Sequence, residues 1–142
     1  MKAAALVVML AACDPFLAGQ SVAPPGRTAR LDEVKGFWGV KSYRLELSHG
    51  VAFALTCTNV GPCEHATIVS DDPAIAEVRP ASLGVLERAG WTNRQQSSAV
   101  VVVGKAPGST RLHLRAKEGK REIVVTVVPA PESRSAARAA HP

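Results

Sequence analysis

The sequence predicts an all-β protein built from about eight short strands. Apolar and polar residues alternate with a period of two in several short stretches, and turn-forming residues separate these stretches at intervals of roughly 6–12 residues. No stretch shows a sustained helical period with capping residues. The length of 142 residues accommodates one domain with tails. These observations favour a β-sandwich or a barrel.

The clearest strands lie in the last third of the globular part. Thr110–Ala116 alternates leucine or alanine with arginine or histidine, which predicts one buried face and one solvated face. Ala99–Val103 is a continuous β-branched run, as expected of a strand buried on both faces. Glu122–Val128 alternates again. Strands this close in sequence are expected to pair antiparallel, because parallel neighbours need a long crossover.

The connections between these strands have turn composition. Pro107-Gly108 suits the two central positions of a type II turn, and Lys117–Lys120 suits a short hairpin loop. Upstream, the polar stretch Ala89–Ser98 is expected to be a loop. Further short strands are expected at Tyr43–Leu47, Val51–Cys57, Ala66–Val69, Ile75–Arg79 and Leu83–Glu87.

The first residues have the pattern of an export signal. Lys2 precedes a short apolar run that ends in Leu10-Ala11-Ala12-Cys13, and this run is too short to span a bilayer comfortably. The four residues resemble the lipobox of bacterial lipoproteins, in which the cysteine thiol carries a diacylglycerol. An ordinary signal peptide cut nearby and a cytoplasmic chain with an apolar N-terminus remain as alternatives.

These features divide the chain into four parts. Residues 1–12 are expected to be a lipoprotein signal peptide, residues 13–36 a lipidated Cys13 followed by a flexible tether, residues 37–129 the domain, and residues 130–142 a disordered tail. A tether of this length would have an end-to-end distance of roughly 25 Å. Phe37 and Trp38 would form either a hydrophobic lid on the domain or a pair that contacts a partner.

Two cysteines remain if Cys13 is lipidated. An even pair in an exported chain favours a disulfide between Cys57 and Cys63, and the residues between them are turn-forming. Free thiols and a metal-binding pair are the alternatives. The spacing is not that of a CxxC redox motif.

Several segments, taken in order, resemble bacterial immunoglobulin-like group 2 domains. They are Gly50–Leu55, Ser70–Val78, Gly104–Thr110 and Val124–Val127. The resemblance implies an immunoglobulin-like β-sandwich of about seven to eight short antiparallel strands, and the composition of the two ends adds flexible N- and C-terminal tails. It also implies the generally non-enzymatic, adhesion-type role of such domains in envelope proteins. The stretch Pro80–Ser98 is longer than the family's hairpin, and the cysteine pair is additional.

The sequence contains few residues in patterns typical of metal binding or catalysis. Cys63 and His65 are the only cysteine and histidine spaced to converge on a metal, and a zinc site needs three or four ligands. Asp71-Asp72, next to a proline, is typical of a turn that hydrogen-bonds its own backbone. No nucleophile-elbow or phosphate-loop motif occurs. We therefore expect no enzyme activity, no cofactor and no bound metal.

Binding is the function class that stays open. Arg111, His113 and Arg115 form a basic stripe on one strand face, which is either a solvated face or a contact for an anionic polymer or headgroup. Trp91 and Arg94 lie in a polar loop with the composition of a recognition tip, an aromatic anchor among polar donors.

The sequence thus predicts an envelope lipoprotein, anchored by its N-terminal lipid to the inner or outer membrane and facing the periplasm or the cell surface. Its domain would serve as an interaction or structural module, with an envelope protein or a polysaccharide as the possible partner. The alternative is a secreted or periplasmic module that binds carbohydrate or an anionic polymer. Export makes nucleic acid an unexpected partner.

Overall fold

A computed structural model describes residues 15–36, 41–59, 62–81 and 99–131. Within these ranges the regular structure consists of strands alone. They are β1 (Phe16–Gln20), β2 (Ala29–Lys35), β3 (Lys41–Ser48), β4 (Ala52–Thr58), β5 (Thr67–Ser70), β6 (Ala76–Pro80), β7 (Ala99–Gly104), β8 (Gly108–Ala116) and β9 (Gly119–Val128). The all-β prediction is confirmed. The expected strand Leu83–Glu87, the loop Ala89–Ser98, and Phe37 with Trp38 lie outside the described residues.

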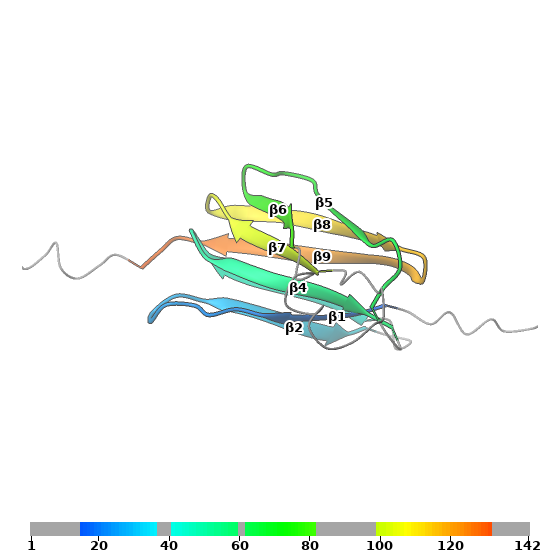
Figure 1. The fold of residues 1–142 in the computed structure, drawn as a ribbon. Coiled ribbons are helices and arrows are strands. Elements are labelled where there is room, and N and C mark those ends of the chain that lie inside the picture. Colours follow the sequence, from blue (N-terminus) through cyan, green and yellow to red (C-terminus); the bar gives the residue numbers. More distant parts are fainter. Residues whose placement is uncertain (1–14, 37–40, 60–61, 82–98, 132–142) are drawn as a thin grey trace, which may run out of the picture.

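The strands form two sheets that pack in two layers (Figure 1). Sheet A has the order β1-β4-β7-β6, and sheet B has the order β2-β3-β9-β8-β5. All neighbouring strands are antiparallel except β3 and β9, which run parallel, with Leu45 opposite Val125. The expectation of purely antiparallel strands is therefore wrong at this pair. The parallel pairing is sterically possible because the intervening chain builds other strands before it returns as β9.

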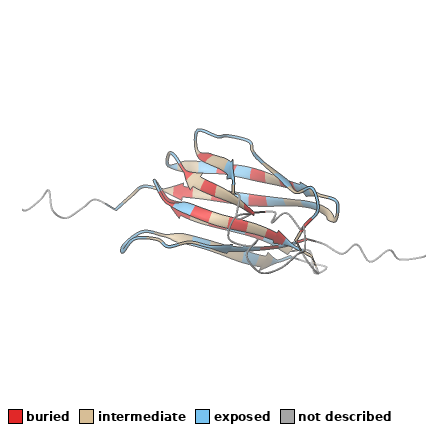
Figure 2. Cartoon of the chain, in the orientation of Figure 1, coloured by how far each residue is buried: buried red, intermediate tan, exposed pale blue. Residues whose placement is uncertain are grey.

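The core lies between the inward faces of the two sheets, and buried and exposed residues alternate along the strands (Figure 2). Sheet B contributes the larger set of fully buried side chains, which are Tyr43, Leu45, Leu47, Leu112, Leu114, Ile123 and Val125. Sheet A supplies Phe53, Leu55 and Val102 from β4 and β7. The period of two that predicted strands in the sequence is the same period that fills this core.

The apolar run of β7 occupies a central position in sheet A, between β4 and β6. Val102 is fully buried against the core, whereas Val101 and Val103 are half-buried on the outer face. A central strand with β-branched residues on both faces is what the continuous run predicted.

The segment expected to be a flexible tether contains two strands, so that expectation is wrong. β1 pairs with β4, and β2 pairs with β3. Leu17 enters the core with 8% of its surface exposed, and its backbone amide donates to the Tyr43 hydroxyl over 3.3 Å. Because Leu17 is the only core side chain of β1, its five residues show no alternating pattern that sequence reasoning could detect.

The two expected turns have different outcomes. Residues 117 and 118 form the two-residue loop of the β8–β9 hairpin, so the hairpin is confirmed. At Gly108 the backbone φ is +153°, far from the roughly +80° of a type II turn, so that turn type is wrong. The conformation still favours glycine, because L side chains rarely adopt a φ of +153°.

The described chain enters and leaves the molecule at opposite ends (Figure 1). Pro15 lies beside the β8–β9 hairpin, where its Cδ is 3.2 Å from the position of a Cβ on Gly119. At the other end Pro131 lies within 3.9 Å of the equivalent point on Gly26. No helix among the described residues is long and apolar enough to cross a membrane.

Candidate functional site

The basic stripe lies on the outer face of β8, as its alternation predicted. Arg111 and Arg115 are exposed and His113 is half-buried. The strand register places Glu122 of β9 opposite His113, with Arg111 opposite Val124. The face is therefore shared between β8 and β9, and its charge depends on both strands.

Acidic neighbours engage two of the three stripe residues. Arg111 Nε lies 3.6 Å from Glu122 Oε1, and His113 Nε2 lies 2.9 Å from Asp71 Oδ1. The outer face of sheet B also carries acidic residues on β2 and β3, where Asp32 opposes Arg44. A surface of alternating charge favours the solvated-face interpretation over an anion-binding stripe.

Arg115 differs from the other two stripe residues because its neighbours are not acidic. The register places it opposite Lys120 on β9 and Thr67 on β5, at the last pairs before the β8–β9 hairpin. Lys117 follows in the hairpin loop. The basic character of β8 is thus concentrated at its hairpin end. The sequence alone does not reveal this, because the neighbours of each stripe residue are set by the pairing of distant strands.

The disulfide between Cys57 and Cys63 lies near this hairpin end and is confirmed. The two Cα atoms are 5.4 Å apart, both residues are buried, and the Cys63 amide donates to the Cys57 carbonyl over 3.1 Å. The alternatives of free thiols and a metal-binding pair are therefore excluded in this state.

The disulfide places Glu64 against the hairpin loop. The Glu64 amide donates to the Glu118 carboxylate over 3.0 Å, and the Glu64 carboxylate accepts from Lys117 Nζ over 2.6 Å. The hydrogen bond that Lys117 donates is the largest cause that lowers the pKa of Glu64 below its usual value of 4.5, and the charge of Lys117 adds to it. The same contact raises the pKa of Lys117.

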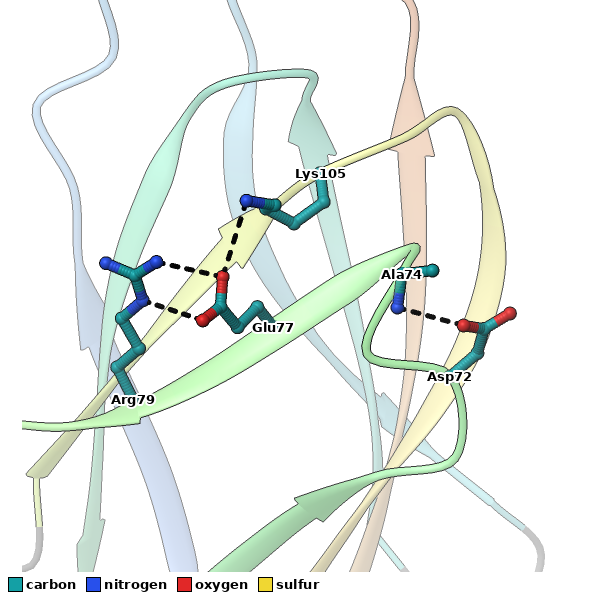
Figure 3. Close-up of polar contacts among 5 residues, drawn as sticks. All are labelled: Asp72, Ala74, Glu77, Arg79 and Lys105. Atoms are coloured by element: carbon teal, nitrogen blue, oxygen red, sulfur yellow. Dashed lines mark hydrogen bonds and ion pairs between the residues drawn. The ribbon is translucent and has the colours of Figure 1, made fainter.

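A second polar cluster lies at the opposite end, around the start of β6 (Figure 3). Asp72 Oδ1 accepts from the Ala74 amide over 2.9 Å, which confirms the self-bonded turn expected of Asp71-Asp72. Glu77 accepts two hydrogen bonds from Arg79, at 2.9 and 3.0 Å, and lies 3.6 Å from Lys105 Nζ. The pKa of Glu77 is lowered from its usual value of 4.5, and the hydrogen bond from Arg79 is the largest cause. These carboxylates are engaged in structural contacts.

An open groove of about 680 Å³ lies along the edge of the sandwich, between β1 and β2. Its lining is mostly apolar or small and includes Leu17, Leu31 and Phe53. Gly19 allows the close approach of this ring, because a Cβ there would lie 2.0 Å from Phe53 Cε1. The one charged lining residue, Arg30, is paired with Asp32 over 2.9 Å.

Three of the predicted site residues, Cys13, Trp91 and Arg94, lie outside the described residues. Among the described residues there is no group of three or more His, Cys, Asp or Glu side chains that would hold a metal ion. The structure therefore brings together the Cys57–Cys63 pair and places Arg111, His113 and Arg115 on one face, but it does not unite these two sets into a pocket.

Comparison with known proteins assigns the chain to no family. No protein-family description matches the chain, and no curated protein is similar to it. Among solved structures, domains 4 and 5 of the S-layer protein SbsC superpose with a TM-score of 0.40 and 16% sequence identity, over 87% of this chain and 81% of that one. A likeness at this level carries no conclusion about function.

Proposed function

We propose that the protein is a membrane-anchored envelope lipoprotein whose immunoglobulin-like β-sandwich serves as a non-catalytic interaction or structural module. The observation that carries the anchoring is the Leu10–Cys13 sequence, which follows an apolar run and resembles a lipobox. Several acyl chains would give stable anchoring, since each buried CH₂ contributes about 0.8 kcal/mol.

The strand order supports the immunoglobulin-like assignment. In the immunoglobulin fold one sheet has the order A-B-E-D and the other contains C, F and G. With β1 and β4 as strands A and B, and β5 to β9 as C to G in chain order, sheet A reads A-B-E-D and sheet B contains G-F-C. The additional strands β2 and β3 then lie beside strand G.

The disulfide supports export. Disulfides persist in oxidising compartments and are rare where thiols are kept reduced. The buried Cys57–Cys63 pair is therefore consistent with a domain that folds outside the cytoplasm. Because the ion pairs at Glu64 and Glu77 account for the titratable clusters described, a structural or adhesive role fits these surfaces better than acid–base chemistry.

Globomycin, which blocks the lipoprotein signal peptidase, tests the anchor. We expect the precursor to accumulate under treatment, and Cys13→Ser to abolish labelling by radioactive palmitate. Ser21→Ala is the matched control, since Ser21 lies beyond the cleavage region and should leave labelling unchanged. A precursor that does not accumulate, together with unlabelled wild-type protein, would refute the anchor.

The alternative, a secreted or periplasmic module that binds carbohydrate or an anionic polymer, has weaker support. Arg111 and His113 already contact acidic partners, so they offer little net charge to an anionic polymer. A pull-down with envelope polysaccharide tests this alternative. Arg111→Ala with Arg115→Ala should leave retention unchanged if the stripe is only a solvated face.

A further inference from the structure

The end of the sandwich at which the chain enters carries a surface that nothing above assigns to a function. We call it the anchor-proximal end. It comprises Pro15 and Phe16, the meeting point of β2 and β3 at Lys35 and Lys41, the Cys63–Thr67 segment and the β8–β9 hairpin from Arg115 to Arg121. These parts come from four regions of the sequence that only the fold brings together.

The chain leaves little length between this end and Cys13. Two residues span at most about 7 Å, so the Pro15 Cα stays within that distance of the Cα of Cys13, whose thiol would carry the lipid. Pro15 is itself fixed, because Arg121 Nε donates to its carbonyl over 3.3 Å and its ring packs at Gly119. A lipid anchor would therefore hold the hairpin at the membrane surface, and the domain would not hang on a long tether.

Cationic residues outnumber acidic ones at the anchor-proximal end. The cationic residues are Lys35, Lys41, Arg115, Lys117, Lys120 and Arg121, and the acidic ones are Glu33, Glu64 and Glu118. The turns at the opposite end are balanced, with Arg27 and Lys105 against Asp71 and Asp72. The modest net charge of the chain is thus placed unevenly, and the excess lies where the lipid would be.

An exposed aromatic residue lies within the same end. Phe16 is 47% exposed, and the Lys41 ammonium lies 4.0 Å from the centre of its ring. Lys41 also contacts Glu33 over 3.0 Å. An exposed aromatic ring beside a lysine suits the boundary between headgroups and acyl chains, where the ring enters the apolar layer and the ammonium stays with the phosphates.

From these observations, and resting on the proposed lipid anchor, we infer that the anchor-proximal end binds an anionic membrane surface. Lys120 and Arg115, which lie opposite each other and have no acidic cross-strand neighbour, contact the headgroup phosphates, and Phe16 inserts between them. The lipid and this surface act together, so the sandwich stands on the membrane with its β8–β9 hairpin down and its opposite end turned away.

Vesicle binding without the lipid tests the inference. Every described strand lies downstream of Pro15, so the chain from residue 13 with Cys13→Ser contains the whole described fold. This chain, exported behind an unrelated signal peptide so that the disulfide forms, is sedimented with phosphatidylglycerol-containing vesicles and with pure phosphatidylcholine vesicles. We expect binding to the anionic vesicles only, and loss of this binding at high salt.

Two matched double variants locate the contact. Each cation at an anionic membrane is worth about fivefold in affinity, so Arg115→Gln with Lys120→Gln should weaken binding roughly twenty-five-fold. Arg30→Gln with Lys105→Gln removes the same charge from the other end of the molecule and should leave the affinity unchanged. Phe16→Ser should weaken binding by the same factor at each salt concentration at which the wild type still binds, because its contribution is apolar.

Equal losses in the two double variants, or equal binding to both kinds of vesicle, would overturn the inference. Equal losses would show that the net charge of the protein, and not its placement, directs binding. Equal binding to both vesicles would show that charge does not direct binding. The outcome is independent of lipidation, since Cys13 is replaced throughout. A failed globomycin experiment and a failed vesicle experiment can therefore be told apart.

Discussion

The contact between Glu64 and Lys117 shows how single residues fix the hairpin end. Lys117 Nζ lies 2.6 Å from the Glu64 carboxylate, while Glu118 accepts from the Glu64 backbone amide. Both side chains are exposed, and exposed ion pairs contribute little to stability on their own. Their effect here is to hold the segment after the disulfide against the β8–β9 loop.

The protonation of Glu64 makes stability depend on pH at acidic values. Its pKa is lowered in the folded state, so its contribution is fully present above the unfolded value of 4.5 and is lost as the pH falls through the folded pKa. We expect the melting temperature to fall across this window, and Glu64→Gln to reduce the fall. Thermal melts followed by circular dichroism at a series of pH values measure the difference.

Glu122→Gln is the control for this prediction. Its carboxylate lies 3.6 Å from Arg111 Nε, so its ion-pair partner belongs to β8 and not to the segment after the disulfide. We expect this variant to keep the wild-type pH dependence. If Glu64→Gln and Glu122→Gln behave alike, the Glu64–Lys117 contact does not contribute to the acid dependence.

Among the elements, β1 and the disulfide fix the edge of sheet A nearest the N-terminus. β1 pairs along its whole length with β4, with Leu17 opposite Cys57. Cys57 in turn is tied to Cys63. Both features stabilise β4. β1 does so by pairing and by burying Leu17, and the disulfide does so by a covalent link.

Leu17→Ala distinguishes a folded β1 from a tether. Removing a buried leucine side chain typically costs about 2–5 kcal/mol, and because Leu17 lies at the rim of the core we expect a loss near the lower value. Val22→Ala, at a position that is 97% exposed, should change the free energy of unfolding by less than about 0.5 kcal/mol. Urea denaturation measures both. Equal stabilities would mean that residues 16–20 do not pack on the core.

Removal of the disulfide should be tolerated at moderate temperature. The cysteines are separated by six positions in sequence, and the chain-entropy relation gives about 2 kcal/mol for so small a loop. We expect Cys57→Ala with Cys63→Ala to remain folded with a lower denaturation midpoint. A reductant should lower the midpoint of the wild type by a similar amount and leave that of the double variant unchanged.

The predictability of the elements follows from how many of their residues face the core. β3, β4, β8 and β9 each bury three or more alternating side chains, and the sequence shows them clearly. β1 buries one, and β2 has half-buried alanine and leucine among charged residues, so neither has a readable period. These two strands form through pairing with β4 and β3, which is information that a local pattern does not contain.

At the scale of the whole molecule, β9 holds sheet B together. It lies between β3 and β8, pairing parallel with the first and antiparallel with the second. Its inward residues Ile123, Val125 and Val127 are all buried. The chain must therefore be almost complete before the sheet closes, because β3 and β9 are far apart in sequence.

Truncation tests this role. We expect a chain that ends after Ala116, and so lacks β9, to show neither a cooperative thermal transition nor native near-ultraviolet circular dichroism. A chain that ends after Pro131 keeps every described strand and should melt near the full-length temperature. Cooperative unfolding of the shorter chain would show that β3 and β8 associate without β9.

Within the candidate site, only the contacts between residues that are close in sequence could be predicted. The pairing of Cys57 with Cys63 follows from a short spacing, and the turn at Asp72 follows from adjacent residues. The anchor-proximal end was not foreseeable, because Lys41, Lys117 and Pro15 meet only once β1 has paired with β4, β3 has paired with β9, and the two sheets have packed together. The acidic partners of Arg111 and His113 were hidden for the same reason.

The opposite placement of the two ends of the chain has a mechanical consequence. A pull between Pro15 and Pro131 acts along the strands, and the hydrogen bonds between strands lie across that direction. Such bonds share the load and must break together, so the sandwich would resist extension as a whole. Single-molecule stretching between residues 15 and 131 should require a higher force than stretching across the β8–β9 hairpin, where bonds open one at a time.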